Sequence, residues 1–442
     1  MTDALPGPLP APRPTGAAQR RFLMLQGPHG PFFDRLAAQI RAAGAECWRV
    51  AFNAGDEFFC SDRDRLIRHD GDAGAWPGHL DRILTEHDIT DIVLYGDVRP
   101  VHAAAVLAAR QRGLRLHVFE EGYLRPYWIT YERGGSNGHS VLMETGLGQM
   151  RQALRHLAED VPRPPSHWGD MRHHKFYGAL YHFMVLVANG RYPMWRSHRA
   201  VPVLREFRLH LRRLVLSPLL ALRRSLLARR IRRGGFPYVL VLMQLEHDAS
   251  FQAHSPFDTM TQFTDQVLDE FAAAAPRHHH LVFKAHPLED DRAATAQAIR
   301  ARAEALGIGD RVHYLPGGKL ARLLDHARAA ITVNSTSAQQ ALWRGLPVKA
   351  LGRAVYDKPE LVSGQPMQEF LRNPARPDPA DYRLFRDYLL QTSQIPGGFY
   401  STRSRAQALR LATDMMLAPD DPYLTLARGQ AAYRQQMGVS KG

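Results

Sequence analysis

DIVLYGDVRPVHAAAVLAARQRGLRLHVFEEG, residues 91–122, predicts a strand, then a helix, then a second strand. DIVLY and LRLHVF are apolar runs of strand length, and the alanine-rich segment between them has the length of a helix. Strands that alternate with helices in this way indicate a parallel α/β sheet. The predicted fold class is therefore α/β.

The same alternation extends toward the N-terminus. RFLMLQGPHG (residues 21–30) predicts a buried strand that ends in a Gly/Pro/His loop, and PFFDRLAAQIRAAG (residues 31–44) predicts a helix. Ligands of open α/β sheets bind outside the carboxyl ends of the strands. We therefore expect three predicted strand ends to converge on one crevice: residues 26–30, 96–97 and 120–122.

A second α/β pattern occupies residues 236–377. Its predicted strands include YVLVL, HHLVF, RVHYL, AAITV and LPVKAL, with helical segments between them. Together with the first pattern, assigned to residues 21–170, it predicts two Rossmann-like domains. Residues 378–442 are expected to form a helical tail. The Pro-rich residues 1–20 are expected to be a disordered leader, because they lack the apolar core of a signal peptide.

Composition limits the class of protein. The 442 residues are 45% hydrophobic, enough to form the cores of two or three domains. The two cysteines, Cys47 and Cys60, cannot form a disulfide scaffold and favour a reduced compartment, the cytoplasm. No uninterrupted apolar stretch reaches the roughly 20 residues that a membrane span needs. The best candidate, residues 176–190, is too short and contains His182.

Positive charge is concentrated between the two predicted domains. Residues 171–235 contain 14 Arg, one Lys and one Glu, which accounts for the whole net charge of +14. A local basic region indicates an anionic partner, such as nucleic acid or anionic lipid. Its arginines are interleaved with Leu, Val, Phe and Trp, which favours a helix lying on an anionic membrane surface. A solvated connector between domains is the alternative.

Two adjacent carboxylates, Glu120 and Glu121, end the stretch that decides the fold. Two like charges this close resist joint ionisation, which is useful in a catalytic pocket and costly elsewhere. We therefore take this pair as the candidate catalytic acids.

Polar side chains also follow the predicted strands of the second domain. Lys284 and His286 lie in KAHP and can bind a phosphate, although a histidine before proline is often an ordinary loop residue. NSTS, residues 334–337, can cap a helix whose free N–H groups favour an anion; capping without a ligand is the alternative. Three further residues can line the same crevice or form a plain polar loop: Gln244, His247 and Ser250.

Several catalytic motifs are absent from the sequence. It has no G-x-x-x-x-G-K-[ST] loop and no G-x-G-x-x-G after a strand, which disfavours kinases and dehydrogenases. It has no H-E-x-x-H and no Cys/His cluster with zinc spacing, so no metal site is predicted. PRHHH, residues 276–280, is interpreted as a solvated histidine run, with metal binding as the alternative.

The acidic pair with its glycine, the His-Pro pair and the Ser/Thr cluster occur in this order across the two α/β halves. This combination resembles the motifs of bacterial CMP-sugar glycosyltransferases, sialyltransferases included. It is more similar still to the capsule polysaccharide synthesis and export family of Gram-negative bacteria, the KpsS-type β-Kdo transferases. The resembling stretches lie within residues 21–359: QGPHGPFF, VLYGDVRP, FEEGYLRPYWIT, KAHPLED and NSTSAQQALWRGLPVKALGRAVYD.

The resemblance implies a GT-B architecture, CMP-Kdo as donor and an anionic lysophospholipid acceptor of the lysophosphatidylglycerol type. It implies a cytoplasmic protein, peripheral on the inner membrane, that begins the Kdo linker of capsular polysaccharide with retention of configuration. By the same resemblance, Glu120 and Glu121 fall at the catalytic acid, His286 at the CMP phosphate, and Ser335 and Thr336 at the nucleotide. Little else is shared with the sialyltransferases, so their inverting stereochemistry is not transferred.

The residues also support this transfer on chemical grounds. A CMP-sugar leaves with one phosphate, which Lys284, His286 and the helix near Ser337 can stabilise. No cofactor or metal is required, although a divalent cation is compatible with the reaction. A carboxylate can stabilise the oxocarbenium-like transition state, attack it, or deprotonate the acceptor.

The remaining candidate contacts fall into two groups. Further donor-binding candidates are Gln244, Pro287, Asn334, Ser335, Thr336 and Ser337. Candidates for contacts with the Kdo carboxylate or the acceptor are Gly27, His29, Gly96, Asp97, Gly122, Arg125 and Lys349. The sequence does not determine which of the two glutamates reacts, the number of Kdo units, the acyl preference or the oligomeric state.

Three other functions are alternatives for this sequence. A GT-B transferase or epimerase for UDP- or ADP-sugars would use the same phosphate site. A non-catalytic adaptor of capsule export would bind the membrane and other capsule synthesis and export proteins. A nucleic-acid binder is disfavoured, because no RRM, KH or helix-turn-helix signature accompanies the arginines.

Overall fold

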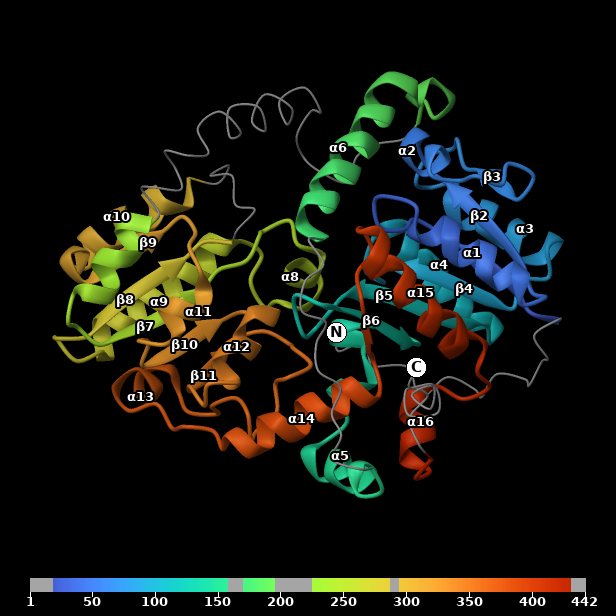
Figure 1. Cartoon of the computed structure of the whole chain (residues 1–442). Helices are drawn as coiled ribbons and strands as arrows, with labels where there is room; N and C mark the ends of the chain where they lie inside the picture. The colour runs from blue at the N-terminus through green and yellow to red at the C-terminus, as the bar shows by residue number, and fades with distance from the viewer. Residues whose placement is uncertain (1–18, 158–169, 195–224, 287–293, 431–442) are drawn as a thin grey trace. The chain divides into compact units, whose positions relative to one another are not determined.

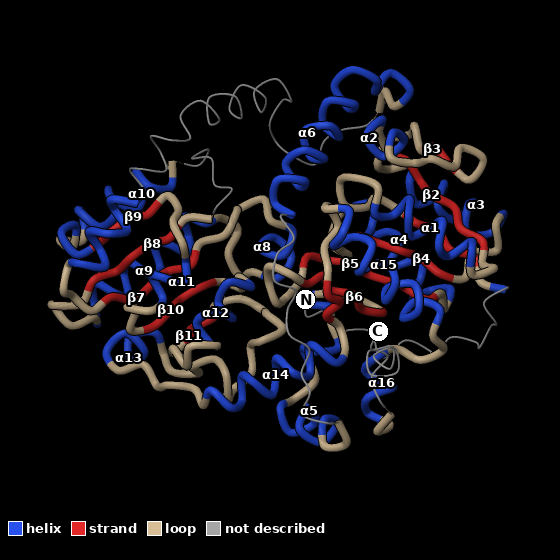
Figure 2. The backbone as a smooth tube through the Cα atoms, viewed as in Figure 1, coloured by secondary structure: helices blue, strands red, loops and turns tan. Residues whose placement is uncertain are grey.

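The computed structural model describes residues 19–157, 170–194, 225–286 and 294–430. The chain divides into two compact units, each with its own sheet (Figures 1 and 2). The first unit comprises Met1–Val141, Arg151–His198 and Asp387–Gly442, and the second comprises Leu142–Met150 and Arg199–Arg386.

The sheet of the first unit has seven strands in the order β12-β6-β5-β4-β1-β2-β3. The five parallel strands are β1 (Arg21–Met24), β2 (Glu46–Ala51), β3 (Leu66–Arg68), β4 (Asp91–Tyr95) and β5 (Arg115–Glu121). β6 (Trp128–Arg133) runs antiparallel to β5, and β12 (Gln394–Pro396) runs antiparallel to β6. Tyr95 pairs with Phe119, so the carboxyl ends of β4 and β5 lie side by side.

Helices cover both faces of this sheet, as parallel strands with two apolar faces require. α1 (Phe32–Ala42) and α15 (Thr402–Leu417) enclose one core, which contains Phe119. α3 (Trp76–Glu86) and α4 (Pro100–Arg112) enclose the other core, which contains Val118. α4 ends at Gly113, whose φ of 65° is a left-handed conformation that glycine adopts without strain.

Apart from the helices of the second unit, the remaining described helices are short, except for α6 (Asp170–Ala188). α2 (Ala54–Phe58) packs against α6. The remainder are α5 (Leu147–Leu154), α16 (Pro422–Ala427) and three 3-10 helices at Asn137–His139, Val141–Met143 and Asn189–Arg191.

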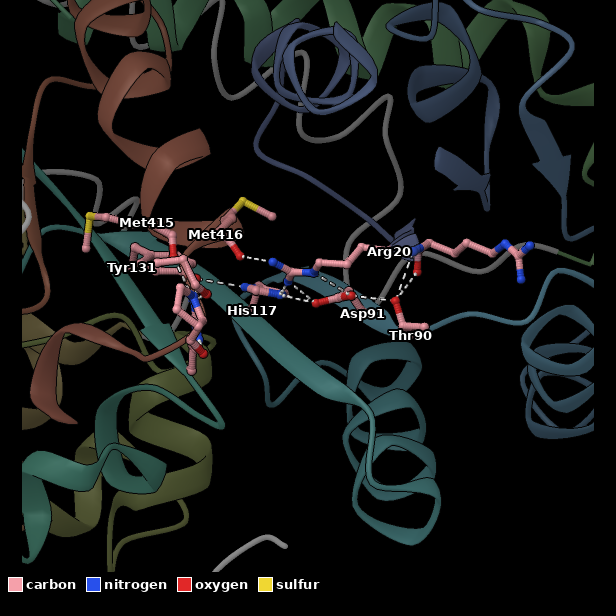
Figure 3. Close-up of polar contacts among 11 residues, drawn as sticks. Arg20, Thr90, Asp91, His117, Tyr131, Met415 and Met416 are labelled. Atoms are coloured by element: carbon pink, nitrogen blue, oxygen red, sulfur yellow. Dashed lines mark hydrogen bonds and ion pairs between the residues drawn. The ribbon is translucent and has the colours of Figure 1, made fainter. Parts of the chain in front are cut away.

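A buried ion pair joins α15 to the sheet (Figure 3). Arg20, only 2% exposed, donates to both carboxylate oxygens of Asp91 and, through Nη1 at 2.6 Å, to the Met416 carbonyl. His117 Nε2 lies 2.8 Å from Asp91 Oδ1, and its Nδ1 lies 2.8 Å from the Tyr131 hydroxyl. Burial raises the pKa of Asp91, but hydrogen bonds from His117 and Arg20 outweigh it and hold this pKa well below its usual range. The end of α15 is therefore fixed to strands at the opposite end of the chain.

The second unit contains a five-stranded parallel sheet in the order β11-β10-β7-β8-β9. Its strands are β7 (Tyr238–Leu242), β8 (His280–Lys284), β9 (Val312–Leu315), β10 (Ala329–Thr332) and β11 (Val348–Ala350). Its helices are α8 (Ala249–His254), α9 (Met260–Ala274), α10 (Thr295–Ala305), α11 (Leu320–Leu324), α12 (Gln339–Leu342), α13 (Met367–Arg372) and α14 (Pro379–Gln391). α14 extends past the end of this unit into the first. α9 begins with a capping box between Thr259 and Gln262, and its apolar face packs into the core of the unit.

The predicted α/β class with two Rossmann-like halves is confirmed. The predicted helical tail, residues 378–442, is helical in α14, α15 and α16. It also contains a strand that was not predicted: β12 extends the sheet of the first unit, and α15 covers one face of that sheet. Gln394 of β12 bonds Thr130 of β6, 264 positions earlier, and no local pattern in the sequence identifies so distant a partner.

Parts of all the predicted segments lie outside the described residues. They are residues 1–18 of the leader, 158–169 of the first domain, 195–224 of the basic region, 287–293 of the second domain and 431–442 of the tail. On either side of the gap at residues 195–224, α6 and residues 225–233 are helical. Across the described ranges, no helix combines the length and the apolar character needed to cross a bilayer.

Candidate active site

Glu120 and Glu121, which end β5, point to opposite faces of the sheet. Side chains alternate along a strand, so Glu121 shares the face of Phe119, beneath α1 and α15. Glu120 shares the face of Val118, beneath α3 and α4. Both glutamates are half-buried, and the Glu121 N–H lies 3.3 Å from Glu120 Oε1. The two carboxylates therefore have separate surroundings.

Two tyrosine hydroxyls fix the Glu121 carboxylate. Tyr95 and Tyr400 each donate to Glu121 Oε1 at 3.2 Å. Burial, and then the charge of Glu121, raise the pKa of Tyr95 well above its usual value, so its phenol stays protonated and remains a donor. Within the part of the chain that the structure describes, no hydrogen-bond donor lies on the second oxygen, Oε2. One oxygen of Glu121 is thus anchored by two tyrosine hydroxyls.

Glu120 lies against a glycine. A Cβ at Gly96 would lie 3.0 Å from Glu120 Oε2, and Gly96 has a φ of +70°. The Gly96 N–H donates to the Phe119 carbonyl at 2.8 Å, and the Gly96 carbonyl lies 2.7 Å from His102 Nδ1. Glycine at this predicted site position lets the end of β4 and the Glu120 carboxylate approach closely.

Asp97, another predicted contact, holds a loop. Its Oδ2 accepts from the Ser136 N–H at 3.0 Å and lies 3.1 Å from His139 Nδ1. The carboxylate itself is buried. This loop leads to Glu132 and Ser140, which are joined by a buried hydrogen bond. Asp97 thus has a structural function, and its contact with a sugar or acceptor stays a prediction.

The end of β1 meets α6. His29 stacks on Tyr181 of α6 with ring centroids 4.3 Å apart. The Tyr181 hydroxyl donates to Asp56 Oδ1 at 3.0 Å and accepts from Gln26 Nε2 at 3.3 Å. Nearby, a Cβ at Gly27 would lie only 2.7 Å from the Phe33 ring. Gly27 is therefore needed for packing, whereas His29 belongs to a polar cluster beside the strand ends.

The last two predicted contacts of this unit differ from one another. A Cβ at Gly122 would lie 2.2 Å from the Trp128 carbonyl, so glycine is required where the chain turns from β5 to β6. Arg125, in that turn, is exposed. The structure shows a backbone requirement at Gly122 and leaves Arg125 untested as a contact.

Local sequence patterns point weakly or not at all to the other members of this cluster. Tyr95 directly precedes the predicted strand end at Gly96, so its place on the strand was a usable signal. Tyr400 had none, because it reaches Glu121 from 279 positions further along the chain. Tyr181 was part of a segment assigned to the basic region, and its contacts with Gln26 and Asp56 depend on tertiary packing.

The predicted donor residues of the second unit follow three neighbouring strands, β10, β7 and β8. Gln244 and Asn334 form a reciprocal pair: Gln244 Nε2 donates to Asn334 Oδ1 at 2.7 Å, and the Asn334 N–H donates to Gln244 Oε1 at 3.0 Å. Asn334 Nδ2 also donates to the Ser250 carbonyl at 3.0 Å. Both amide side chains are buried, so this pair joins the ends of β7 and β10.

The Ser/Thr cluster begins a short helical segment. The Ser335 side chain accepts from the Ser337 N–H, and the two hydroxyls lie 2.7 Å apart. Thr336 opens a 3-10 helix (Thr336–Ala338) that continues into the four residues of α12. Tyr356 donates to the Ser335 carbonyl at 2.7 Å. The predicted cap is present, but the helix that it begins is brief.

The predicted cations of this unit occupy different positions. Lys284 is buried at the end of β8, its Nζ lies 3.2 Å from the Ala285 carbonyl, and burial lowers its pKa. His286 is half-buried two residues later, and Pro287 lies outside the described residues. Lys349 Nζ donates to the carbonyls of Ser363 and Gln365, so it ties down a loop and its contact with a sugar stays a prediction.

Metal-binding side chains are not clustered in the ranges that the structure covers. No group of three or more His, Cys, Asp or Glu residues able to hold a metal ion occurs among the described residues.

Comparison with known proteins gives concordant matches. A family model described as capsule polysaccharide biosynthesis protein matches residues 90–400. The capsule polysaccharide export protein KpsS of Escherichia coli is 30% identical over 389 residues, covering 86% of this chain and 97% of that protein. The capsule polysaccharide modification protein LipB of Neisseria meningitidis serogroup B is 32% identical over 392 residues, covering 86% and 91%.

One solved structure is also similar to this chain. The KpsC β-Kdo 2,7 transferase of Thermosulfurimonas dismutans matches with a TM-score of 0.41 and 13% identity, over 88% of this chain and 98% of that chain.

Proposed function

The chain belongs to the capsule polysaccharide biosynthesis protein family, and we propose that it transfers Kdo from CMP-Kdo to a lysophosphatidylglycerol acceptor. The product would begin the Kdo linker of capsular polysaccharide. The observation that carries the proposal is the Glu121 carboxylate, with Oε1 anchored by Tyr95 and Tyr400 and no donor on Oε2 among the described residues. An oriented carboxylate at a strand end is suited to react at a sugar carbon.

In the proposed first step, Glu121 Oε2 attacks the anomeric carbon of Kdo. The bond from that carbon to the phosphate oxygen breaks, and its electron pair leaves with CMP. In the second step the acceptor hydroxyl attacks the same carbon and releases the Glu121 carboxylate, and its proton passes to a base, for which Glu120 is the candidate. Two displacements retain the anomeric configuration.

The second unit is proposed to bind the donor. His286 and Lys284 would balance the charge of the departing phosphate, and the hydroxyls of Ser335 and Ser337 would bind the nucleotide. The Gln244–Asn334 pair holds the strand ends that carry these groups. CMP leaves with a single phosphate, so we propose that no metal ion is required.

The proposed location is the cytoplasmic face of the inner membrane, where a lysophospholipid acceptor and other capsule synthesis proteins would be present. This proposal rests on the family and on the lipid character of the acceptor.

A donor panel tests the proposed function. The purified protein is incubated with a fluorescent lysophosphatidylglycerol and one donor in each reaction: CMP-Kdo generated in situ, CMP-sialic acid or a UDP-hexose. The mass of the lipid is then measured by mass spectrometry. We expect one added Kdo residue with CMP-Kdo alone. Transfer from a UDP-sugar would contradict the proposed donor. Absence of transfer from every donor, with the protein folded and CMP-Kdo intact, would favour the non-catalytic adaptor.

A further inference from the structure

We propose that the outward face of α6 inserts into the interfacial region of an anionic phospholipid bilayer and brings the acidic site to its lipid acceptor. The bilayer contact is argued from α6 itself, whereas the delivery of an acceptor rests on the proposed function.

The outward face of α6 is apolar from Phe176 to Val187. Phe176, Phe183 and Val187 are 61%, 56% and 58% exposed. They are spaced seven and eleven residues from the first, which puts them on one stripe of a helix with 3.6 residues per turn. Ala179 and Leu186 are exposed on the same side. We call these five residues the α6 stripe.

From residue 171 onward, the charges carried by α6 and the residues just after it have one sign. Residues 171–194 contain no Asp or Glu. Arg172 and Lys175 are exposed in the first turns of the helix, and Arg191 is exposed just beyond its end, where it pairs with Glu57 at 3.3 Å. An apolar stripe with cationic ends complements a bilayer that contains anionic lipids, because the side chains can bury in the acyl boundary while the cations meet the headgroups.

The opposite face of α6 rules out a membrane-spanning position. Tyr181 and Val185 are buried against the first unit, and α2 packs alongside, with Phe58 exposed at its end. A helix with one face held by protein and one face apolar and exposed can lie only along the surface of a bilayer. No soluble segment among the described residues covers the stripe, as its exposure shows.

The buried face of α6 leads directly to the acidic site. His174 stacks on Tyr400, with ring centroids 4.4 Å apart, and Tyr400 donates to Glu121. One helical turn further on, Tyr177 lies against Gly30, where a Cβ would be 3.1 Å from its ring. α6 therefore has the stripe on one side and the residues that fix Glu121 on the other. A membrane-embedded lipid would meet the acid pair beside this helix.

The test compares binding to vesicles. Phe176→Ser/Phe183→Ser removes the two largest side chains of the stripe, and Leu107→Ser is the matched control, since Leu107 is 58% exposed on α4 of the same unit. We expect the double variant to bind phosphatidylglycerol-containing vesicles about tenfold more weakly than wild type. The control should bind like wild type, and all three proteins should have the same circular dichroism and unfolding transition. Equal binding by the double variant, or an equal loss in the control, would overturn the proposal.

The depth to which the α6 stripe enters the bilayer is measured separately. The tryptophan fluorescence of Phe183→Trp should be quenched by brominated acyl chains more strongly than that of the wild-type protein. The fluorescence of Leu107→Trp should show no such additional quenching. If the wild-type protein is a dimer and the double variant is a monomer, the stripe is an interface between copies of the chain. That result would overturn the bilayer assignment. Binding of dispersed lysolipid without any binding to vesicles would overturn it as well.

A transfer assay separates this proposal from the proposed function. With an acceptor of short acyl chain, fully dissolved in water, the double variant should transfer Kdo at the wild-type rate. With the acceptor in vesicles its rate should fall about tenfold. If the wild-type protein binds vesicles through the stripe but transfers to neither acceptor, the bilayer contact stands and the proposed transferase function fails.

Discussion

The hydroxyl of Tyr400 donates a hydrogen bond to Glu121 Oε1 at 3.2 Å, across 279 positions of sequence. Tyr400 follows β12, which is paired with β6, so the returning C-terminal segment reaches the acid that ends β5. With the Tyr95 hydroxyl on the same oxygen, this bond sets the direction in which the other oxygen of Glu121 points. The C-terminal segment thus completes the candidate site of the first unit.

Removing the Tyr400 hydroxyl should slow transfer without unfolding the protein. Tyr400→Phe leaves the ring stacked on His174 but loses one of the two bonds that orient Glu121. We expect kcat to fall roughly tenfold to a hundredfold, with KM for CMP-Kdo nearly unchanged, because only orientation is lost. Tyr388→Phe is the matched control, since no hydrogen bond of the buried Tyr388 hydroxyl occurs among the described residues. An equal effect of both variants would contradict this function for Tyr400.

Breaking the Gln244–Asn334 pair should weaken donor binding. Gln244→Leu leaves Asn334 Oδ1 and the Asn334 N–H without their Gln244 partners, at a cost to stability of about 1–3 kcal/mol. Since the side-chain pair no longer orders the residues that follow β7 and β10, we expect the affinity for CMP to fall roughly tenfold by calorimetry. Thr264→Val removes a buried hydroxyl on α9 of the same unit and should reduce stability while preserving CMP affinity. Unchanged CMP binding by Gln244→Leu would place the donor elsewhere.

The ion pair of Arg20 and Asp91 should dominate the stability of the first unit. Arg20→Met leaves a buried carboxylate without its cation, which we expect to lower the free energy of unfolding by about 3–5 kcal/mol. Arg21→Met is the control, because Arg21 pairs with Asp88 at the surface, where such pairs contribute about 0–1 kcal/mol. Urea titrations of both variants measure the difference, and similar values for the two would contradict the argument.

His117 should make this unit sensitive to acid. Burial lowers its pKa to about 4, whereas in the unfolded chain it stays near 6.5. Between these values the unfolded state binds a proton that the folded state does not, so stability falls as the pH is lowered from 6.5 to 4. Glu132 acts in the opposite direction, since burial raises its pKa to about 7. Comparing wild type with His117→Gln isolates the histidine: the variant should lose less stability over this interval, and parallel curves would contradict its assignment as a buried neutral group.

Chelation should leave transfer intact. The proposed phosphate partners are side chains and backbone N–H groups, so EDTA is expected to change the rate of Kdo transfer less than twofold. A loss that added Mg²⁺ restores would show that a metal ion takes part.

Local patterns in the sequence were sufficient for the strands and helices and for their carboxyl ends. They placed Glu120 and Glu121 at the end of β5, and Gln244 and Asn334 after β7 and β10, because apolar runs and the polar residues that end them are neighbours in the chain. The functions of the glycines were only partly predictable. Gly122 was predicted as a contact, whereas its close approach to the Trp128 carbonyl depends on the pairing of β5 with β6.

Two features were beyond local patterns. β12 and α15 were predicted as a helical tail because their partners lie in strands near the other end of the chain. The surface of α6 was interpreted from its arginine-rich surroundings, but the packing of Tyr181 and His174 against the first unit determines which of its faces is exposed. Composition shows that a segment is basic and apolar, and tertiary contacts then decide which side chains meet solvent.

The most direct test of the central claim is the mass of lysophosphatidylglycerol after incubation with CMP-Kdo and either wild-type protein or Glu121→Gln. The account predicts a lipid heavier by one Kdo residue with the wild-type protein and an unmodified lipid with the variant, both proteins being folded. A wild-type rate in Glu121→Gln, or no product from the wild type while CMP-Kdo stays intact, would contradict it.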